Sequence, residues 1–429
     1  MRHRRLLPAV AAAVAALVAS PLLAGCGSSS GDGTVTLTFA NADPSATWQK
    51  AIDGFQKANP TVKVKQLNIP YAQYTSTINQ RMSQGGGGID LMVVDAGGAL
   101  ADFANRGFLA DISDLKNDAL NVALSPDMVT SREVGGKLYA LETWTTAQFL
   151  YYNKDALAKA GVEEPPGDPA KPWTYQQLTD AARKVQTAKA ADYPLLFDQW
   201  DSYYQLQMMG VSAGGGDGIS ADGKVDFSNA GWQKMLTWYG GLFKDGLSPR
   251  GITNDKNGAL FSGGKAGFII SGPWGLPVSL SGGVKFGIAP APYWAGGKPA
   301  TSTDSWAVGI SAKTKQRAAA EQFLRYLTID PQGNSESAEV AGITPTNKES
   351  YAKYAEAAEK SAGEVSANFG DIMEYELKNS AVHRPAVTGY SVFEPGANQM
   401  FADIRNGSDP QQRAAEADRA IADQIARLK

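Results

Sequence analysis

The apolar positions at the start of the folded chain follow two different periods. Residues 35–39 place an apolar side chain at every second position, which is the period of a β-strand. Residues 48–55 place one at every third or fourth position, which is the period of an amphipathic helix, and Asn59-Pro60 ends that helix. The pattern therefore predicts a strand followed by a helix.

The same alternation continues along the next forty residues. Residues 62–67 predict a second strand, and the helix after it closes at the glycine run 85–88. Residues 89–95 are almost unbroken in apolar character, as expected for a parallel strand covered on both faces. Strand, helix, strand, helix, strand in this order predicts a doubly wound α/β lobe.

The first 26 residues carry a different pattern. Three arginines precede an apolar run that ends in Leu23-Ala24-Gly25-Cys26, and interruptions such as Pro8 and Pro21 make the run a poor membrane span. Its end resembles the bacterial lipobox, in which the cysteine is acylated and the chain is cut before it. We expect a signal peptide over 1–25, lipidation of Cys26 and a tether over 26–33, with a plain secretory signal as the alternative.

Composition narrows the function. Removing residues 1–25 shifts the formal charge from −3 to −6, and the remaining lysines and arginines are scattered among acids, so we expect no nucleic-acid partner. Only two histidines, His3 and His383, are present, which excludes a multi-histidine metal site. Nucleotide-binding and hydrolase signatures are also absent, and we expect neither a cofactor nor a metal. A pair of carboxylates could still hydrolyse glycosides.

Several short motifs keep a characteristic order over nearly the whole mature chain. They lie at 55–64, 88–91, 107–112, 136–141, 150–155, 172–178, 261–268, 272–274 (Gly-Pro-Trp), 286–292, 318–327 and 342–345. In this order they resemble the extracellular solute-binding proteins of ABC importers, in the maltose-binding-protein-like group. That family commonly has a proline soon after Gly-Lys-Leu-Tyr, and its absence here leaves the path of the first hinge open.

The resemblance implies an α/β, two-lobed periplasmic-binding-protein fold of type II, with a ligand cleft between discontinuous lobes. It places lobe 1 at 34–145 and 303–347, and lobe 2 at 146–302 and 348–429. The chain would cross between the lobes near 143–148, 298–305 and 345–350. Two such lobes close like a hinge around a ligand.

Ligands of open α/β sheets meet the carboxyl ends of the strands, which selects residues in the first lobe. Asn41 and Asp43 follow the first predicted strand, Tyr71 opens the helix after the second, and Asp95 ends the third. A sugar offers hydroxyl groups at its edge and apolar C–H faces above and below. It therefore needs carboxylates or amides beside aromatic rings.

The resemblance places further candidates around the cleft. They are Glu142, Trp144, Trp200, Tyr204 or its neighbour Tyr203, Trp274, Asp304, Trp306 and Arg384. We expect Trp144 and Trp274 to be exposed for stacking, whereas Trp200 fits the core equally well and Trp232 and Trp238 are expected in the core. Asp304 fits a cap or hinge as well as a ligand contact, and Arg384 could pair with Asp95, Glu142 or Glu394 instead of a ligand.

The sequence predicts a monomeric, extracytoplasmic lipoprotein that captures a carbohydrate, in particular an oligosaccharide, and delivers it to the membrane subunits of an ABC permease. It is not expected to be an enzyme. Two alternatives stay open at this stage. One is a receptor for a polyamine or a glycerophosphodiester, and the less favoured one is a secreted glycosidase.

Overall fold

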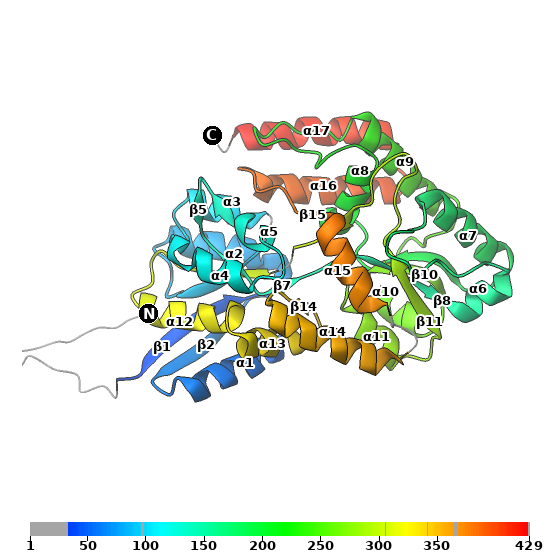
Figure 1. The fold of residues 1–429 in the computed structure, drawn as a ribbon. Coiled ribbons are helices and arrows are strands. Elements are labelled where there is room, and N and C mark those ends of the chain that lie inside the picture. The colour runs from blue at the N-terminus through cyan, green and yellow to red at the C-terminus, as the bar shows by residue number, and fades with distance from the viewer. Residues whose placement is uncertain (1–32, 96–97, 305, 341, 364–367, 428–429) are drawn as a thin grey trace, which may run out of the picture. The chain divides into compact units, whose positions relative to one another are not determined.

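Two β-sheets with separate apolar cores organise the chain (Figure 1). The computed structural model describes residues 33–95, 98–304, 306–340, 342–363 and 368–427. Residues 35–429 form one compact unit. The predicted signal peptide, Cys26 and the tether up to residue 32 lie outside the described residues. Among the described residues, no helix is both long and apolar enough to cross a bilayer.

The first sheet has five strands in the order β2-β1-β3-β13-β6. They are β2 (Val62–Asn68), β1 (Val35–Asn41), β3 (Leu91–Asp95), β13 (Trp306–Ile310) and β6 (Leu141–Glu142). The first three are parallel, and β13 is antiparallel to both of its neighbours. The first four residues of β3 are buried, which confirms the prediction of a strand covered on both faces.

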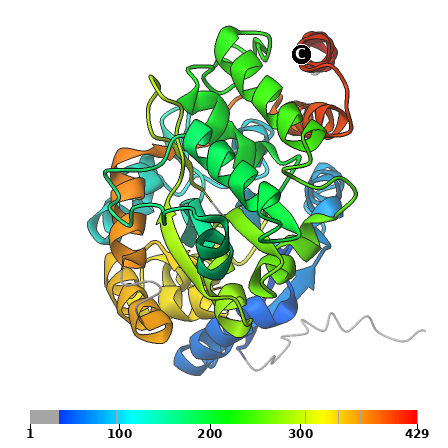
Figure 2. The ribbon, with the colours of Figure 1, turned by 90° about the vertical axis from the view of Figure 1, so that its right-hand side faces the viewer.

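The second sheet has four strands in the order β11-β8-β10-β9. They are β11 (Phe286–Pro290), β8 (Phe149–Asn153), β10 (Ala266–Ser271) and β9 (Tyr193–Phe197). β9 and β10 are parallel, and β8 is antiparallel to β10 and β11. In Figure 2 this sheet and the helices between residues 154 and 281, drawn in shades of green, face the viewer.

Helices surround each sheet, and we name each sheet with its helices a lobe. Lobe 1 has α1 (Ser45–Ala58), α2 (Tyr71–Ser83), α3 (Ala99–Asn105), the 3-10 helix η1 (Ser113–Leu115), α4 (Lys116–Val122), α12 (Arg317–Thr328) and α13 (Pro331–Glu339). Lobe 2 has α6 (Lys154–Ala160), α7 (Tyr175–Thr187), α8 (Tyr203–Ser212), α9 (Ala230–Lys244), α10 (Asn254–Ser262), α11 (Gly275–Ser281), α14 (Lys348–Ala362), α15 (Phe369–Asn379), α16 (Tyr390–Arg405) and α17 (Pro410–Ala426). The short α5 (Asp127–Thr130) gives Met128 to one core and Val129 to the other.

The chain passes between the two cores three times. The first passage lies between Trp144 in the lobe 1 core and Ala147 in the lobe 2 core. The second lies between Ala300 in the lobe 2 core and Ala307 in the lobe 1 core. The third follows Ala338, the last member of the lobe 1 core. The expected lobe boundaries at 145/146, 302/303 and 347/348 remain our proposal for where each lobe ends.

Very short strand pairs lie at these passages. β7 (Trp144–Thr145) pairs with β14 (Thr344–Pro345), and β12 (Thr301–Ser302) pairs with β15 (Ala381–Val382), while β4 (Glu133–Val134) and β5 (Lys137–Leu138) form a separate hairpin. The Thr145 and Thr303 hydroxyl groups lie 3.1 Å apart, and the backbone N–H of Gln148 donates to the Thr301 hydroxyl at 2.7 Å. The Thr301 hydroxyl in this way satisfies a backbone N–H that such short ladders leave without a partner, and the two other hydroxyl groups pair with each other.

A substitution at Trp144 would measure how much the stability of the lobe 1 core depends on the short strand β7. Its ring is fully buried and stacks on Trp48 at 4.5 Å between centroids, and its indole N–H donates to Ser337. Replacing Trp144 with alanine should lower the free energy of unfolding by about 3–5 kcal/mol, because a large cavity would open. Urea denaturation measures this, with Val278→Ala on the exposed face of α11 as a control that should change little. A loss below about 1 kcal/mol would contradict the core assignment.

Candidate ligand-binding site

The lobe 1 part of the site begins at Asp43, two residues beyond β1. Its Oδ2 accepts the indole N–H of Trp48 at 2.9 Å, and its Oδ1 accepts that of Trp306 at 3.2 Å. Burial raises the pKa of Asp43, and the two indole donors act in the opposite direction. Trp306 begins β13, lies opposite Asp95 in the sheet and packs at 6.0 Å from the ring of Tyr74.

An ion pair connects this group to lobe 2. Arg384 donates from Nη1 to Asp95 Oδ2 at 2.7 Å and pairs through Nη2 with the other carboxylate oxygen. Glu394 lies 3.8 Å from Nη1. Burial alone would lower the pKa of Arg384, but the nearby carboxylates raise it, and burial together with the charge of Asp95 raises the pKa of Glu394 to about 7. Two of the three pairing partners expected for Arg384 are therefore found, Asp95 and Glu394.

The lobe 2 part of the site continues from the guanidinium of Arg384, which lies 5.1 Å from the ring centroid of Tyr204. The Tyr204 ring is 6.5 Å from that of Trp274, and the Trp274 indole N–H donates to Asp198 Oδ2. Ser271, the last residue of β10, donates to the same oxygen at 3.1 Å. Burial raises the pKa of Asp198, and these two donors lower it.

A single series of contacts thus joins the carboxyl ends of strands from both sheets. It runs through Asp43, Trp306, Asp95, Arg384, Tyr204, Trp274 and Asp198. We call these seven residues the contact series. It contains flat aromatic surface, carboxylates and one paired cation, which is the chemistry that a hydroxyl-rich, uncharged ligand requires.

A second group of charges lies directly behind the contact series. The buried carboxylate of Asp304 accepts from Arg132, from His383 Nδ1 at 2.6 Å and from the backbone N–H of Arg384 at 2.7 Å. His383 Nε2 lies 3.1 Å from Asp127 Oδ2. We call Arg132, Glu142, Asp304, His383 and Asp127 the ion cluster. Glu142 belongs to it because its carboxylate lies 3.7 Å from Arg132.

Charge pairing in the ion cluster raises the pKa of its histidine and lowers the pKa of two of its aspartates. Burial alone would lower the pKa of His383, but hydrogen bonds to Asp127 and Asp304 raise it to about 10. The hydrogen bond from His383 lowers the pKa of Asp127 to about 2. Burial opposes ionisation of Asp304, yet Arg132 and His383 lower its pKa. The imidazole is therefore a cation at neutral pH and donates from both nitrogens.

The backbone of Asp304 is also unusual, because its φ of 77° lies in the left-handed region. Aspartate enters that region more readily than most side chains, although at a cost. The three donors to its carboxylate hold the residue there, and the cap or hinge role and the ligand contact weighed for Asp304 both stay predictions.

Six of the predicted site residues belong to the contact series: Asp43, Asp95, Tyr204, Trp274, Trp306 and Arg384. Glu142 and Asp304 belong to the ion cluster instead. Asn41 is fully buried and is hydrogen-bonded to Gln66 and Asn68, and Tyr71 is the first residue of α2, with a side chain outside the described set. Tyr203, the alternative to Tyr204, is fully buried in the lobe 2 core.

Trp144 and Trp200, both predicted site residues, lie in the apolar cores and not in the contact series. The exposed position expected for Trp144 is wrong, because its two-residue strand passes through the lobe 1 core and leaves no ring face at the surface. Trp200 is 2% exposed and donates to the carbonyl of Ile252, which is the core position weighed for it. Trp232 is fully buried as expected, and Trp238 is partly buried against the same core. All ligand roles remain predictions.

Sequence reasoning missed Asp198, Arg132 and the ionic role of His383. Asp198 directly follows β9, so the strand-end rule used for lobe 1 would have found it in lobe 2. Arg132 gave no local signal, because its main partner Asp304 is 172 positions away.

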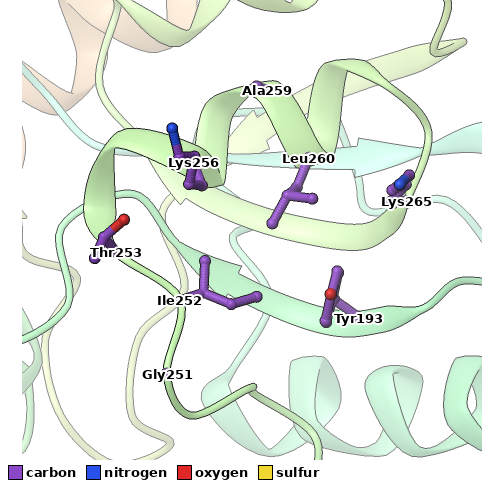
Figure 3. A pocket seen from close by; sticks show the side chains of 8 residues that line it. All are labelled: Tyr193, Gly251, Ile252, Thr253, Lys256, Ala259, Leu260 and Lys265. Atoms are coloured by element: carbon purple, nitrogen blue, oxygen red, sulfur yellow. The ribbon is translucent and has the colours of Figure 1, made fainter.

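A surface pocket of ≈ 530 Å³ lies elsewhere on lobe 2 (Figure 3). It is lined by Tyr193, Gly251, Ile252, Thr253, Lys256, Ala259, Leu260 and Lys265. Tyr193 is the first residue of β9 and Lys265 directly precedes β10, so the pocket lies at the amino ends of these strands. Asp198 and Ser271 lie at the opposite ends, and the pocket is therefore separate from the contact series.

Comparison with solved structures shows which fold this arrangement represents. An ABC substrate-binding protein from Listeria monocytogenes in complex with cycloalternan has a TM-score of 0.78 at 18% identity, over 92% of this chain and 99% of that one. A maltose-bound protein from T. maritima has a TM-score of 0.74 at 20% identity. The match covers 92% of this chain and 100% of that one. The expected two-lobed, maltose-binding-protein-like fold is confirmed.

Sequence comparison gives the family. Residues 40–333 match the family model of bacterial extracellular solute-binding proteins, and the chain belongs to this family. A probable ABC transporter-binding protein from Deinococcus radiodurans is 25% identical over 415 residues, which is 92% of this chain and 94% of the relative. A galactooligosaccharide-binding protein from Bacillus subtilis is 25% identical over 396 residues, which is 88% of this chain and 86% of the relative.

The ion cluster predicts a pH dependence of stability that passes through His383. Since the pKa of His383 rises from an ordinary 6.5 to about 10 on folding, its contribution to stability should be complete below pH 6.5 and lost as the pH rises toward 10. Urea denaturation of the wild type and of His383→Asn at several pH values isolates this contribution as the difference between the two. A difference that stays constant from pH 6 to pH 10 would contradict the assignment.

Proposed function

We propose that the protein binds an uncharged carbohydrate, in particular an oligosaccharide, at the contact series and delivers it unchanged to an ABC permease. The observation that carries this proposal is the pairing of partly buried tryptophan rings with carboxylates at the strand ends of both lobes. Trp274 and Trp306 are only partly buried, whereas Trp48, Trp144 and Trp232 are fully buried. The partly buried rings suit the C–H faces of a sugar, and the carboxylate of Asp95 offers acceptor oxygens to its hydroxyl groups.

The ligands named for relatives support the same class. Besides the galactooligosaccharide-binding relative, a mannitol-binding protein from Pseudomonas aeruginosa is 26% identical over 352 residues. The solved relatives carry cycloalternan, acarbose, α-D-tagatose, maltose and D-mannitol. These ligands are saccharides, saccharide-like inhibitors or polyols.

The charges of the contact series weigh against the two non-sugar alternatives. An anionic glycerophosphodiester would need an available cation, but Arg384 is engaged by Asp95 and lies near Glu394. A polyamine would meet the charge of Arg384 beside the carboxylates that it needs. The sn-glycerol-3-phosphate-binding relative from Agrobacterium fabrum matches only 48% of this chain. An uncharged ligand avoids both conflicts.

We further propose that residues 1–25 are removed and that Cys26, once lipidated, holds a monomeric receptor at the outer face of the membrane. The Leu-Ala-Gly-Cys ending and the lone cysteine support this proposal. A tethered receptor stays within reach of its permease, and two or more acyl chains make the attachment stable.

A thermal-shift panel of neutral sugars and polyols, a polyamine and a glycerophosphodiester tests the ligand class. A ligand at one hundred times its dissociation constant stabilises the folded state by about 2.7 kcal/mol, so a binding sugar should raise the melting temperature clearly. Shifts from the polyamine or the phosphodiester alone would overturn the proposal. Hydrolysis products in the same samples would indicate an enzyme.

Trp274→Ala should weaken binding of the sugar found in that panel about tenfold or more, because one stacking face is lost. Trp238→Ala is the matched control, since Trp238 is also a partly buried lobe 2 tryptophan whose indole N–H has a side-chain acceptor, Thr179. It should leave the affinity unchanged. Equal losses in both variants would mean that the effect is one of stability, not of ligand contact.

The lipid anchor is tested separately with Cys26→Ser in the full-length chain. Wild-type protein should incorporate radiolabelled palmitate and sediment with membranes, whereas the variant should incorporate none, because the acylated thiol is missing. Ser28→Ala serves as the control and should behave as wild type. Labelling that persists in Cys26→Ser would rule out this cysteine as the lipid site.

A further inference from the structure

The two partly buried tryptophans of the contact series share one arrangement. In each lobe, an indole N–H donates to an aspartate that follows a strand, Trp306 to Asp43 after β1 and Trp274 to Asp198 after β9. Resting on the proposed function, we propose that Asp198 is a positioning residue that holds the Trp274 ring in its ligand-stacking orientation. Asp43 has the same role for Trp306 in lobe 1.

The ring of Trp274 lies close to the backbone of the turn that carries it. Trp274 lies in the turn between β10 and α11, at the N-cap position of α11. Its side chain makes no capping hydrogen bond to the helix. A Cβ atom on Gly272 would lie 2.3 Å from the Trp274 ring, so the ring lies directly over this glycine. Contact with a glycine limits the distance of the ring but does not define its direction, and the hydrogen bond to Asp198 adds a directional restraint.

Asp198 is itself held in place by groups from the neighbouring strand. Its backbone N–H donates to the carbonyl of Ile270 at 2.9 Å, and Ser271 donates to Oδ2, the oxygen that also accepts from Trp274. A Cβ atom on Gly275 would lie 2.8 Å from the Ser271 hydroxyl oxygen, so glycine at 275 leaves room for that hydroxyl. Ser271, at the end of β10, and Asp198 therefore connect this strand to the indole by hydrogen bonds.

The lobe 1 counterpart connects its ring to the core by a parallel route. Asp43 accepts from Trp306 through one oxygen and from the buried Trp48 through the other. Trp48 in turn stacks on Trp144. A core tryptophan that makes no ligand contact thereby fixes the carboxylate that orients Trp306, and the orientation of both ligand-facing rings is determined by the sheets.

A double-mutant cycle separates positioning from direct ligand contact. Maltose and D-mannitol, both present in solved relatives, are titrated by calorimetry into wild type, Asp198→Ala, Trp274→Ala and the double variant. Asp198→Ala alone should lower affinity about tenfold, the effect of losing a hydrogen bond to a charged group. In the Trp274→Ala background it should lower affinity no further, because its action passes through the indole. A further loss in the double variant would show that Asp198 contacts the sugar itself and would overturn the proposal.

A ligand-free measurement keeps the test independent of the proposed function. The near-UV circular dichroism difference between wild type and Trp274→Ala isolates the signal of the ordered indole. Asp198→Ala should remove most of that signal, and Asp198→Asn, which keeps an acceptor oxygen, should restore it. A signal that survives in Asp198→Ala would overturn the positioning role even if neither maltose nor mannitol binds.

Asp201→Asn is the matched control. Asp201 lies on the same loop, but its carboxylate pairs with Arg405 and accepts from Tyr239, and asparagine tolerates its φ of 62°. This variant should leave the Trp274 signal and the sugar affinity unchanged, while it lowers stability. Loss of the Trp274 signal in Asp201→Asn as well would attribute the effect to general loosening of the loop and would overturn the specific role of Asp198.

Discussion

The carboxylate of Asp304 lies where the chain passes between the two cores, and its charge is almost completely removed from water. An unpaired charge in such a place would cost several kcal/mol, so the site exists only because Arg132, His383 and the backbone N–H of Arg384 converge on it. These donors come from segments more than 170 and about 80 residues away in the sequence. The passage between the lobes is therefore stabilised by a cluster that only the complete fold assembles.

The ion cluster also determines where the contact series can form. Because Asp304 holds the backbone of Arg384, the guanidinium of that residue reaches Asp95 and the face of Tyr204. The charge of the arginine is balanced by the carboxylates of Asp95 and Glu394. The ion cluster and the contact series thus share one segment, residues 383 and 384.

Five of the tryptophans form two groups with different surroundings. Trp48, Trp144 and Trp232 fill the cores and are fully buried, whereas Trp274 and Trp306 are partly buried beside strand-end aspartates. In both lobes the aspartate connects the partly buried ring to the end of a strand. The similarity of the two arrangements, built from unrelated sequence segments, reflects the shared position at the carboxyl end of a parallel strand.

The amino-acid sequence alone was enough to predict the alternation of strands and helices at the start of lobe 1, the strand-end positions of Asp43 and Asp95, and the family through the order of its motifs. These are local properties of the chain, since apolar period and turn residues act over a few positions. It could not place Trp144 in the core, identify Arg132 as the partner of Asp304, or choose Tyr204 over Tyr203. These positions follow from which faces meet when distant segments pack, because burial and ion pairing are properties of neighbours in space and not of neighbours in sequence.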